Sequence, residues 1–352
     1  MQTLKAVLLA APWILSQIVS ADGLTASRMS ERDDIRAFIQ TMVAKHDMDQ
    51  QKLEDLFDAT NLRSSIIDAL DRPATSRAWY QFSPGFLSAA KVRSGVAFWR
   101  EQESWLTKAK LKFGVPEEII VAIIGIESAY GKNLGRFRTM DALTTIAFEY
   151  PRRSDYFRQE LEQFLLLAQE ENVDPLSLYS SYAGAMGWPQ FMPSSFRNYA
   201  VDFDGDGERN IWKNPADVIG SVAYYFAKFG WQTGAPIVTP AQPGDIDLEP
   251  LLAERFELKR SLDEWQQLGI TRLDQSINGD NKASLFRLES EPGKYSYWFG
   301  LQNFYVISRY NKSVHYSMAV TQLAALIRAE YLNPTPSPQV TQAAPKKLKA
   351  RR

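Results

Sequence analysis

A run of eight apolar or glycine residues that ends in a carboxylate places the strongest constraint on this chain. The run covers 119–126, reads IIVAIIGI, and is followed by Glu127. Pro116 lies just before it, with Glu117 and Glu118 next, so the pattern predicts a helix that starts at this proline. A helix that is apolar on every face is a buried helix. Glu127 should then lie at the edge of a buried element, where burial raises the pKa of a carboxyl.

A carboxyl with a raised pKa has two interpretations. If it stays neutral near pH 7, it can protonate a leaving group as a general acid. Alternatively, Glu127 ends the apolar face and points to water or to an arginine, which is a structural role. The residues of this stretch alone leave both interpretations open.

The composition limits the chemistry that the chain can perform. There is no cysteine, and the histidines are His46 and His315. Disulfides, thiol catalysis and a lipid anchor on cysteine are therefore excluded, and a zinc site or a histidine-based triad is disfavoured. With 45% hydrophobic and 23% charged residues, the 352-residue chain should be largely globular. Catalysis should then depend on carboxylates, tyrosines, amides or lysines.

The two ends of the chain differ from its body. Residues 1–21 resemble a secretory signal, with Lys5, an apolar run and the small residues Ser20 and Ala21, so we expect export without lipidation. The alternative is an uncleaved membrane anchor. The last 19 residues hold five basic groups and no acid, which predicts a disordered basic tail. The whole chain has a net charge of −1 although the tail holds five basic groups, so the body between the two ends is acidic. We therefore expect no nucleic-acid partner.

Periodicity predicts a mainly α, α+β protein. Apolar residues at helical spacing indicate helices in 30–69, 92–113, 153–172, 215–229 and 315–332. Strand-like alternation appears in four stretches, FELKRSL, ASLFRLES, KYSYWFG and NFYVISRY. The predicted organisation is a signal peptide 1–21, an N-terminal helical domain 22–113, a core 114–235, a small β-rich insertion 236–300, a C-terminal return to the helical part 301–332 and a basic tail 333–352.

Two further stretches carry functional signals. SYAGAMGWPQFMPSSF, residues 181–196, combines glycines with Gln190 and apolar side chains, which favours a groove floor over a core strand. DFDGDGERNIWKNPAD, residues 202–217, has the ligand spacing of the first half of a calcium loop. Lys213 stands where such a loop has its last glutamate, and Asp217 can replace that carboxylate in a longer loop. An acidic surface turn is the alternative.

Four stretches in order resemble the lytic murein transglycosylase B family. They are GIESAYGKNLGRFRTMDAL, AGAMGWPQFMPSSF, DFDGDGERNIW and RYNKSVHYSMAV, and the resemblance covers most of residues 78–330. The resemblance implies a lysozyme-like core, a helical domain and a small β domain. It also implies a periplasmic enzyme that acts on peptidoglycan.

The resemblance assigns roles residue by residue. Glu127 matches the single catalytic acid of the family. The matching substrate-binding residues are Ser181, Gln190, Tyr225, Tyr310, Asn311, Tyr316 and Tyr80. The matching metal ligands are Asp202, Asp204, Asp206, Glu208 through its backbone carbonyl, and Asp217. No cofactor is expected for the chemistry, and a structural Ca²⁺ is expected in the loop.

The implied reaction cleaves the β-1,4 bond between N-acetylmuramic acid and N-acetylglucosamine and forms a 1,6-anhydro sugar, with Glu127 acting as acid and then as base. The alternatives are a hydrolytic muramidase and a non-catalytic peptidoglycan-binding scaffold. The expected partners are peptidoglycan strands, with proteins of cell-wall synthesis or division as further candidates. We expect membrane contact only if the signal is uncleaved.

Overall fold

The computed structural model describes residues 28–71 and 77–334, which fall into two compact units divided after Ala59. The signal-like segment 1–21 and most of the basic tail lie outside the described residues. Among the described residues, no helix combines the length and apolar character needed to cross a membrane. The prediction of a mainly α protein with a small β-rich part is confirmed.

The first unit is a pair of helices that follows one turn of 3₁₀ helix, Met29–Glu31. The helices are α1 (Asp33–His46) and α2 (Gln50–Asp58). They bury one apolar side each, formed by Ile35, Ile39, Met42, Leu53 and Phe57. Asp49 begins α2 by accepting a hydrogen bond from the Lys52 amide, as an N-cap does.

The second unit contains the remaining helices and all of the strands in the described residues. Its helices are α3 (Ser64–Leu70), α4 (Trp79–Phe82), α5 (Ala89–Glu101), α6 (Glu103–Phe113), α7 (Glu117–Ser128), α8 (Thr139–Glu149), α9 (Ser154–Glu170), α10 (Pro193–Tyr199), α11 (Pro215–Lys228), α12 (Glu249–Leu252), α13 (Leu262–Gln267), α14 (Gln302–Tyr310) and α15 (Val314–Leu332). A two-stranded sheet pairs β1 (Phe137–Arg138) with β2 (Tyr179–Ser180).

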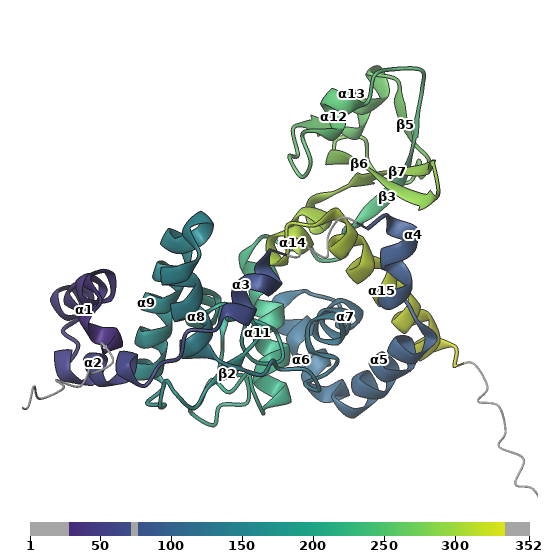
Figure 1. Ribbon diagram of the computed structural model, residues 1–352. Coiled ribbons are helices and arrows are strands. Elements are labelled where there is room, and N and C mark those ends of the chain that lie inside the picture. The colour runs from purple at the N-terminus through teal and green to yellow at the C-terminus, as the bar shows by residue number, and fades with distance from the viewer. Residues whose placement is uncertain (1–27, 72–76, 335–352) are drawn as a thin grey trace, which may run out of the picture. The chain divides into compact units, whose positions relative to one another are not determined.

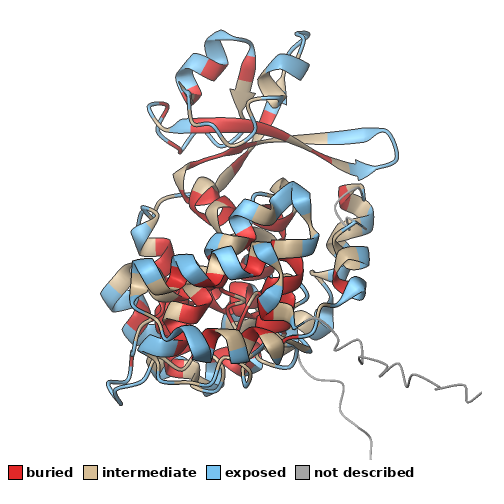
Figure 2. Cartoon of the chain, turned by 60° about the vertical axis from the view of Figure 1, so that its left-hand side comes forward, coloured by how far each residue is buried: buried red, intermediate tan, exposed pale blue. Residues whose placement is uncertain are grey.

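Helix α7 is the centre of the helical part of this unit (Figure 1). It packs against α5, α6, α11 and α15, and residues 119–124 are at most 2% exposed. Figure 2 shows that the buried residues of the helical part gather in its interior. Burial of each large aliphatic side chain contributes about 1.5–3 kcal/mol. The apolar run thus fixes α7 in place, as its sequence predicts.

The prediction of a single helix over 92–113 is wrong in one respect. The chain forms two helices, α5 and α6, because Gln102 has φ −108° and ψ 21°, outside the helical region. The break lets α5 pack on α7 and α15 while α6 packs mainly on α11. Gly114 then ends α6 in a left-handed conformation, which glycine adopts readily.

The β-rich module, residues 236–300, is an antiparallel five-stranded sheet with two short helices, α12 and α13. Its strands are β3 (Val238–Pro243), β4 (Arg260–Ser261), β5 (Ile270–Arg272), β6 (Lys282–Glu291) and β7 (Lys294–Gly300), in the order β4-β6-β7-β3-β5. Leu285 faces the module's own core with Trp265. The next residue, Phe286, packs on the opposite face with Phe304 and Met318 of α14 and α15. Because successive side chains of β6 point to opposite faces of the sheet, the strand contributes apolar side chains to two separate cores.

The prediction of a strand in NFYVISRY is wrong, because these residues form most of helix α14. Asn303, Phe304 and Ile307 are buried at helical spacing. The side chain of Asn303 accepts from the Gln232 amide at 2.8 Å and donates to the carbonyls of Gln232 and Ala235. These tertiary contacts outweigh the strand-like composition.

A glycine before β1 permits a close backbone contact. Gly135 has φ +91°, and a Cβ there would lie 1.9 Å from the Ser180 carbonyl oxygen. A side chain would therefore separate β1 from β2 and displace Ser181, which follows β2.

We expect Gly135→Ala to lower the free energy of unfolding by about 3 kcal/mol, because it adds a steric clash to left-handed strain. Gly293, in the β6–β7 turn, is the matched control, since it has φ +73° and open space around it. Gly293→Ala should cost about 1 kcal/mol from strain alone. Urea unfolding measures both values, and equal losses would contradict the steric argument.

Candidate active site

Glu127 lies in the last turn of α7, where the chain reverses sharply. Ala129, Tyr130 and Gly131 all adopt left-handed conformations, with φ of 50°, 60° and 79°. The Ser128 hydroxyl accepts the Gly131 amide at 3.0 Å and donates to the Ile124 carbonyl at 3.3 Å. Left-handed backbone costs roughly 1–2 kcal/mol for each non-glycine residue. Such strain persists only where the surrounding structure enforces it, and it is common at active sites.

The packing of Tyr130 enforces this turn. Its ring stacks on Phe98 with centroids 4.9 Å apart, and its hydroxyl is buried. A Cβ on Gly125 would lie 2.4 Å from that hydroxyl oxygen, so the glycine in the apolar run makes room for the tyrosine. The exit from α7 is thus held by core packing.

The other carboxylates of α7 have cationic partners, whereas Glu127 has a tyrosine. Glu117 pairs with Lys110 at 2.9 Å, and Glu118 pairs with Arg328 at 2.7 Å. Glu127 is half-buried, and its Oε1 accepts a hydrogen bond of 2.5 Å from the Tyr316 hydroxyl. Among the described residues, no lysine or arginine forms an ion pair with it.

This environment sets the ionisation of Glu127. Burial raises the pKa of its carboxyl to about 7, against the opposing effect of the Tyr316 hydrogen bond. Burial and the nearby Glu127 charge also raise the pKa values of the Tyr310 and Tyr316 hydroxyls well above their ordinary value. The tyrosines therefore stay protonated and act as hydrogen-bond donors, while Glu127 can exchange a proton near neutral pH.

Three predicted tyrosines gather beside Glu127 from three helices, α11, α14 and α15. The Tyr225 and Tyr310 rings lie 4.8 Å apart between centroids. Tyr225 donates to the Arg309 carbonyl at 2.7 Å, and Tyr310 donates to the Pro189 carbonyl at 2.6 Å. The second bond connects the cluster to the loop that contains Gln190.

That loop, residues 181–192, is held by hydrogen bonds between its own side chains and its own backbone. Gln190 has φ 52°, and its side-chain amide donates to the Gly187 carbonyl at 2.8 Å. The Ser181 hydroxyl accepts the amides of Ala183 and Ala185 at 3.3 and 3.1 Å. Both predicted residues thus rigidify the loop, and Ser181 keeps its hydroxyl proton for another acceptor.

Asn311 and Tyr80 lie farther out. Asn311 is exposed at the C-terminal end of α14. Tyr80 lies on α4, and its hydroxyl accepts a hydrogen bond from Gln81 at 3.3 Å. The sequence did not single out two other aromatic residues of α4, Trp79 and Phe82. Their rings lie 5.7 and 5.4 Å from the ring of His315, the residue before Tyr316. The density of aromatics around AWYQF is the signal that could have found them.

The acidic loop brings three of its carboxylates together. Oxygens of Asp202, Asp204 and Asp217 lie within 4.8 Å of one another. Asp217 is fully buried, and burial followed by the charges of the other two raises the pKa of its carboxyl, against two backbone hydrogen bonds. Among the described residues, none of the three pairs with a lysine or arginine. Clustered oxygens without a cationic partner fit a divalent cation such as Ca²⁺.

The predicted ligand Asp206 is arranged differently from these three. The Asp206 carboxylate accepts the Glu208 amide at 2.9 Å within the loop, so it lies outside the group of three. Asp217 accepts the amides of Phe203 and Asn210 at 2.8 Å each, which ties both ends of the loop to α11. The buried Asp217 therefore anchors the loop through hydrogen bonds to its backbone.

The chain is similar to known proteins over most of its length. The family described as Transglycosylase SLT domain matches residues 30–325. Membrane-bound lytic murein transglycosylase B of Escherichia coli is 44% identical over 300 residues, which are 82% of this chain and 81% of that protein. The structure of soluble lytic transglycosylase SltB1 from Pseudomonas aeruginosa has a TM-score of 0.79 at 47% identity and covers 84% of this chain and 99% of that one.

A third relative was solved with calcium. The Escherichia coli lytic transglycosylase Slt35, solved in complex with calcium, has a TM-score of 0.77 at 43% identity and covers 84% of this chain and 93% of that one. The expected architecture of a lysozyme-like core with helical and β-rich parts is therefore confirmed. With the family match extending over most of its length, this chain belongs to the transglycosylase SLT domain family.

Proposed function

We propose that this chain, a lytic murein transglycosylase by family, cleaves the β-1,4 bond between N-acetylmuramic acid and N-acetylglucosamine with Glu127 as acid and then as base. One observation carries the proposal: a half-buried carboxyl with a pKa of about 7 is surrounded by tyrosines and lacks a cationic partner among the described residues.

In the first step, Glu127 donates its proton to the glycosidic oxygen as the bond from that oxygen to the anomeric carbon breaks. The N-acetyl carbonyl oxygen of the muramic acid stabilises the positive charge that develops on this carbon. Because Tyr316 donates to Oε1, the other oxygen, Oε2, is the one that carries the transferable proton. A pKa near the working pH suits a group that must both give and take a proton.

In the second step, the ionised Glu127 takes the proton of the muramic acid 6-hydroxyl. That oxygen bonds to the anomeric carbon, which closes the 1,6-anhydro ring and returns Glu127 to its protonated form. Water takes no part, so one carboxyl suffices. The Tyr316 hydroxyl stabilises the charged intermediate form of Glu127 by hydrogen bonding.

The hydrolytic alternative is not favoured. Hydrolysis by a pair of carboxylates needs a second one at about 5–9.5 Å. Glu117 and Glu118 are nine or ten residues earlier on α7, about 14 Å away along the axis, and both are neutralised by cations. The non-catalytic scaffold is disfavoured because a binding surface has no need of a carboxyl with a pKa of about 7.

We also propose that the protein acts in the periplasm on peptidoglycan strands and that Ca²⁺ stabilises it through Asp202, Asp204 and Asp217. The ion would connect the acidic loop to α11 and so support the helix that carries Tyr225. It would be structural, since the proposed proton transfers need no metal.

We expect Glu127→Gln to fold but to lose at least about 100-fold of the activity, because general acid–base catalysis supplies about 10²–10⁴-fold. Mass spectrometry of fragments released from purified peptidoglycan measures it, with anhydro products lighter by one water than hydrolysis products. Glu118→Gln, the same change on the same helix, is the control and should keep most of the activity. A Glu127→Gln variant with more than about a tenth of the wild-type rate would refute the assignment.

The same variant should show a pH-dependent gain in stability. The folded-state pKa of about 7 exceeds the ordinary 4.5, so the folded state binds more protons between these values and wild-type stability falls as pH rises through this window. Glu127→Gln removes this cost. Urea unfolding at pH 4 and pH 8 should show Glu127→Gln gaining stability relative to the wild type at pH 8; an unchanged difference would rule out the raised pKa.

Tyr316→Phe should shift the alkaline limb of the kcat–pH profile to higher pH. The Tyr316 hydrogen bond lowers the pKa of Glu127, so its removal leaves burial unopposed and the pKa rises further. Initial rates between pH 5 and 9 measure the alkaline limb, along which the acid form is lost. Tyr305→Phe is the control, because that residue lies on α14 away from this hydrogen bond. A limb that stays in place would exclude the proposed role of Tyr316.

Calcium should raise the melting temperature by about 5 °C when its concentration is about 100 times Kd. Asp217→Asn should abolish most of this rise, because it removes the buried carboxylate from the group of three. Asp174→Asn changes an exposed turn aspartate and is the control. Differential scanning calorimetry with calcium and with chelator makes the comparison, and identical wild-type curves would argue against the site.

A further inference from the structure

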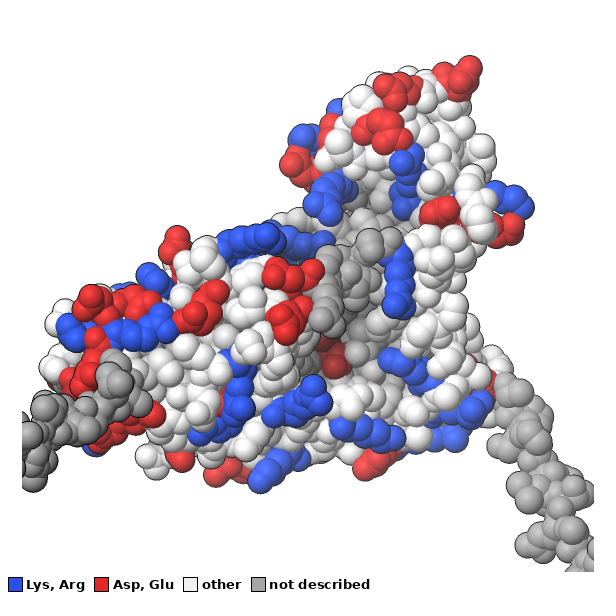
Figure 3. Space-filling view, viewed as in Figure 1, with Lys and Arg blue, Asp and Glu red and all other residues white. Residues whose placement is uncertain are grey.

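A pocket beside the two-stranded sheet lies apart from the Glu127 cluster, and the proton transfers proposed above make no use of it. Its volume is about 470 Å³, which is within the range of sites that bind small molecules. Figure 3 shows lysine and arginine side chains over the region that Figure 1 labels β2. The lining residues that matter here come from β1, β2, α8 and the segments just before α3 and β1: Arg63, Arg136, Arg138, Asp141 and Tyr179.

The pocket has an excess of positive charge. Three arginines line it, Arg63, Arg136 and Arg138, together with one acid, Asp141. Asp141 is 1% exposed, and Arg138 neutralises it through hydrogen bonds of 2.7 and 3.1 Å. Among the described residues, no carboxylate other than Asp141 pairs with Arg63, and none pairs with Arg136. Two positive charges are thus left over, and a pocket of this kind attracts an anion.

Arg63 is available to such an anion. Its Nε and Nη2 lie 3.4 and 3.3 Å from one oxygen of Asp141, which are long hydrogen bonds. Its Nη1 makes no hydrogen bond among the described residues, and the side chain is 49% exposed. Nη1 and the second hydrogen of Nη2 can therefore hold a carboxylate in bidentate geometry. The backbone is fixed as well, because the Arg63 amide donates to the Thr145 hydroxyl at 3.0 Å.

Two aromatic rings accompany the cations. Tyr179 pairs with Arg138 across the small sheet and is 50% exposed. The Arg136 guanidinium lies 5.6 Å from the centroid of the Phe137 ring, a cation–π contact that restrains this long side chain. An exposed aromatic ring can pack on the apolar face of a sugar while a neighbouring guanidinium binds a carboxylate. The combination therefore suits a sugar that carries a carboxylate.

Strand β2 connects the pocket to the proposed active site. Ser181 follows β2 directly, and its hydroxyl accepts the Ala185 amide within the loop 181–192. Near the other end of this loop, the Pro189 carbonyl accepts the hydrogen bond of Tyr310, which belongs to the Glu127 cluster. A glycan strand bound along the loop would extend from Glu127 toward the pocket.

We propose that the pocket is a subsite for a peptide-free N-acetylmuramic acid of the same glycan strand, whose lactyl carboxylate binds Arg63 and Arg136. The inference rests on the proposed function, since it places the pocket along the substrate. Where a peptide is attached, the lactyl carboxyl forms an amide and carries no charge. Hydrolysis of that amide frees the carboxylate, which is then the only charged group of the glycan. An amidase reaction must therefore precede binding at this subsite.

The test measures the binding of short glycan strands to the Glu127→Gln protein by isothermal titration calorimetry. It compares strands stripped of peptides by an amidase, stripped strands whose carboxylates are converted to methylamides, and strands that keep their peptides. Arg63→Gln is combined with Arg136→Gln. Arg136→Gln is also tested alone, because this exposed arginine has no ion pair among the described residues whose loss could affect folding.

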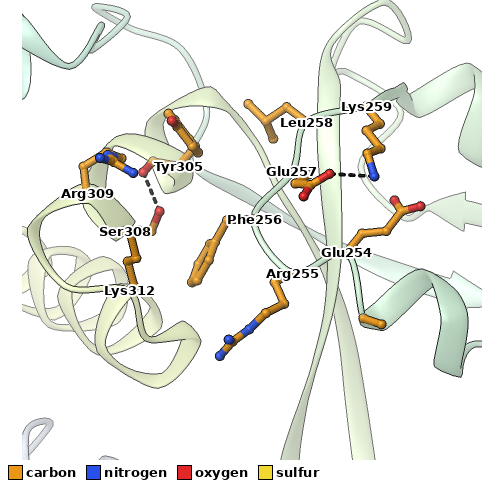
Figure 4. A pocket seen from close by; sticks show the side chains of 11 residues that line it. Glu254, Arg255, Phe256, Glu257, Leu258, Lys259, Tyr305, Ser308, Arg309 and Lys312 are labelled. Carbon is orange, nitrogen blue, oxygen red and sulfur yellow. Dashed lines mark hydrogen bonds and ion pairs between the residues drawn. The ribbon is translucent and has the colours of Figure 1, made fainter. Parts of the chain in front are cut away.

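Lys259→Gln is the matched control for the loss of one positive charge. This lysine lines a different pocket, between the loop 253–259 and α14 (Figure 4). It is already paired with Glu257 at 2.6 Å.

We expect the Glu127→Gln protein to bind stripped strands about tenfold more tightly than methylamidated strands, as for a charge-assisted hydrogen bond. High salt should reduce this difference. The double variant should lose the difference, Arg136→Gln should lose part of it, and Lys259→Gln should keep it. All of these proteins should bind the methylamidated strands equally, because those strands offer no charge to the pocket.

Equal affinity for stripped and methylamidated strands would overturn the inference, and so would an equal loss by the double variant on both. A loss confined to the peptide-bearing strands would show that the pocket binds peptide carboxylates instead. Release of anhydro products by the wild type is measured on the same strands. If products form while binding ignores the carboxylate, the pocket assignment fails and the proposed function stands. If binding depends on the carboxylate but no anhydro product forms, the proposed function fails and the carboxylate site stands.

Discussion

The desolvation of one carboxyl, opposed by one tyrosine hydroxyl, is the interaction on which the site depends. Burial raises the pKa of Glu127 to about 7, and the Tyr316 hydrogen bond limits that rise. The balance requires that no cation approach the carboxyl. The two other acids of α7 have their own cations near the start of the helix, which leaves the end of the helix to the tyrosines.

The burial of α7 provides the stability that this arrangement needs. Its apolar run packs against four helices, and a left-handed turn at Ala129 and Tyr130 follows at once. A strained turn and a buried acid both disfavour folding, and the core around 119–124 offsets them. The same packing fixes the direction of Glu127, so the proposed acid is held in place before substrate binds.

Peripheral elements connect to this centre through α11 and α14. Asp217 ties the acidic loop to α11, the helix that carries Tyr225. Helix α14 packs on the β-rich module through Phe304 and ends at Tyr310. One helix thus connects the module and the tyrosine cluster.

Local patterns by themselves determined the buried helix that starts after Pro116 and carries Glu127 in its last turn, the β-rich character of 236–300 and the acidic loop, because each is set by residues close in sequence. Only the tertiary structure decided the break at Gln102 and the helical state of 303–310, where packing partners outweigh composition. It also decided that Asp217, and not Asp206, joins Asp202 and Asp204, and that Tyr316 meets Glu127 across 189 residues. Such pairs depend on how distant helices pack, which the spacing of residues along one segment does not encode.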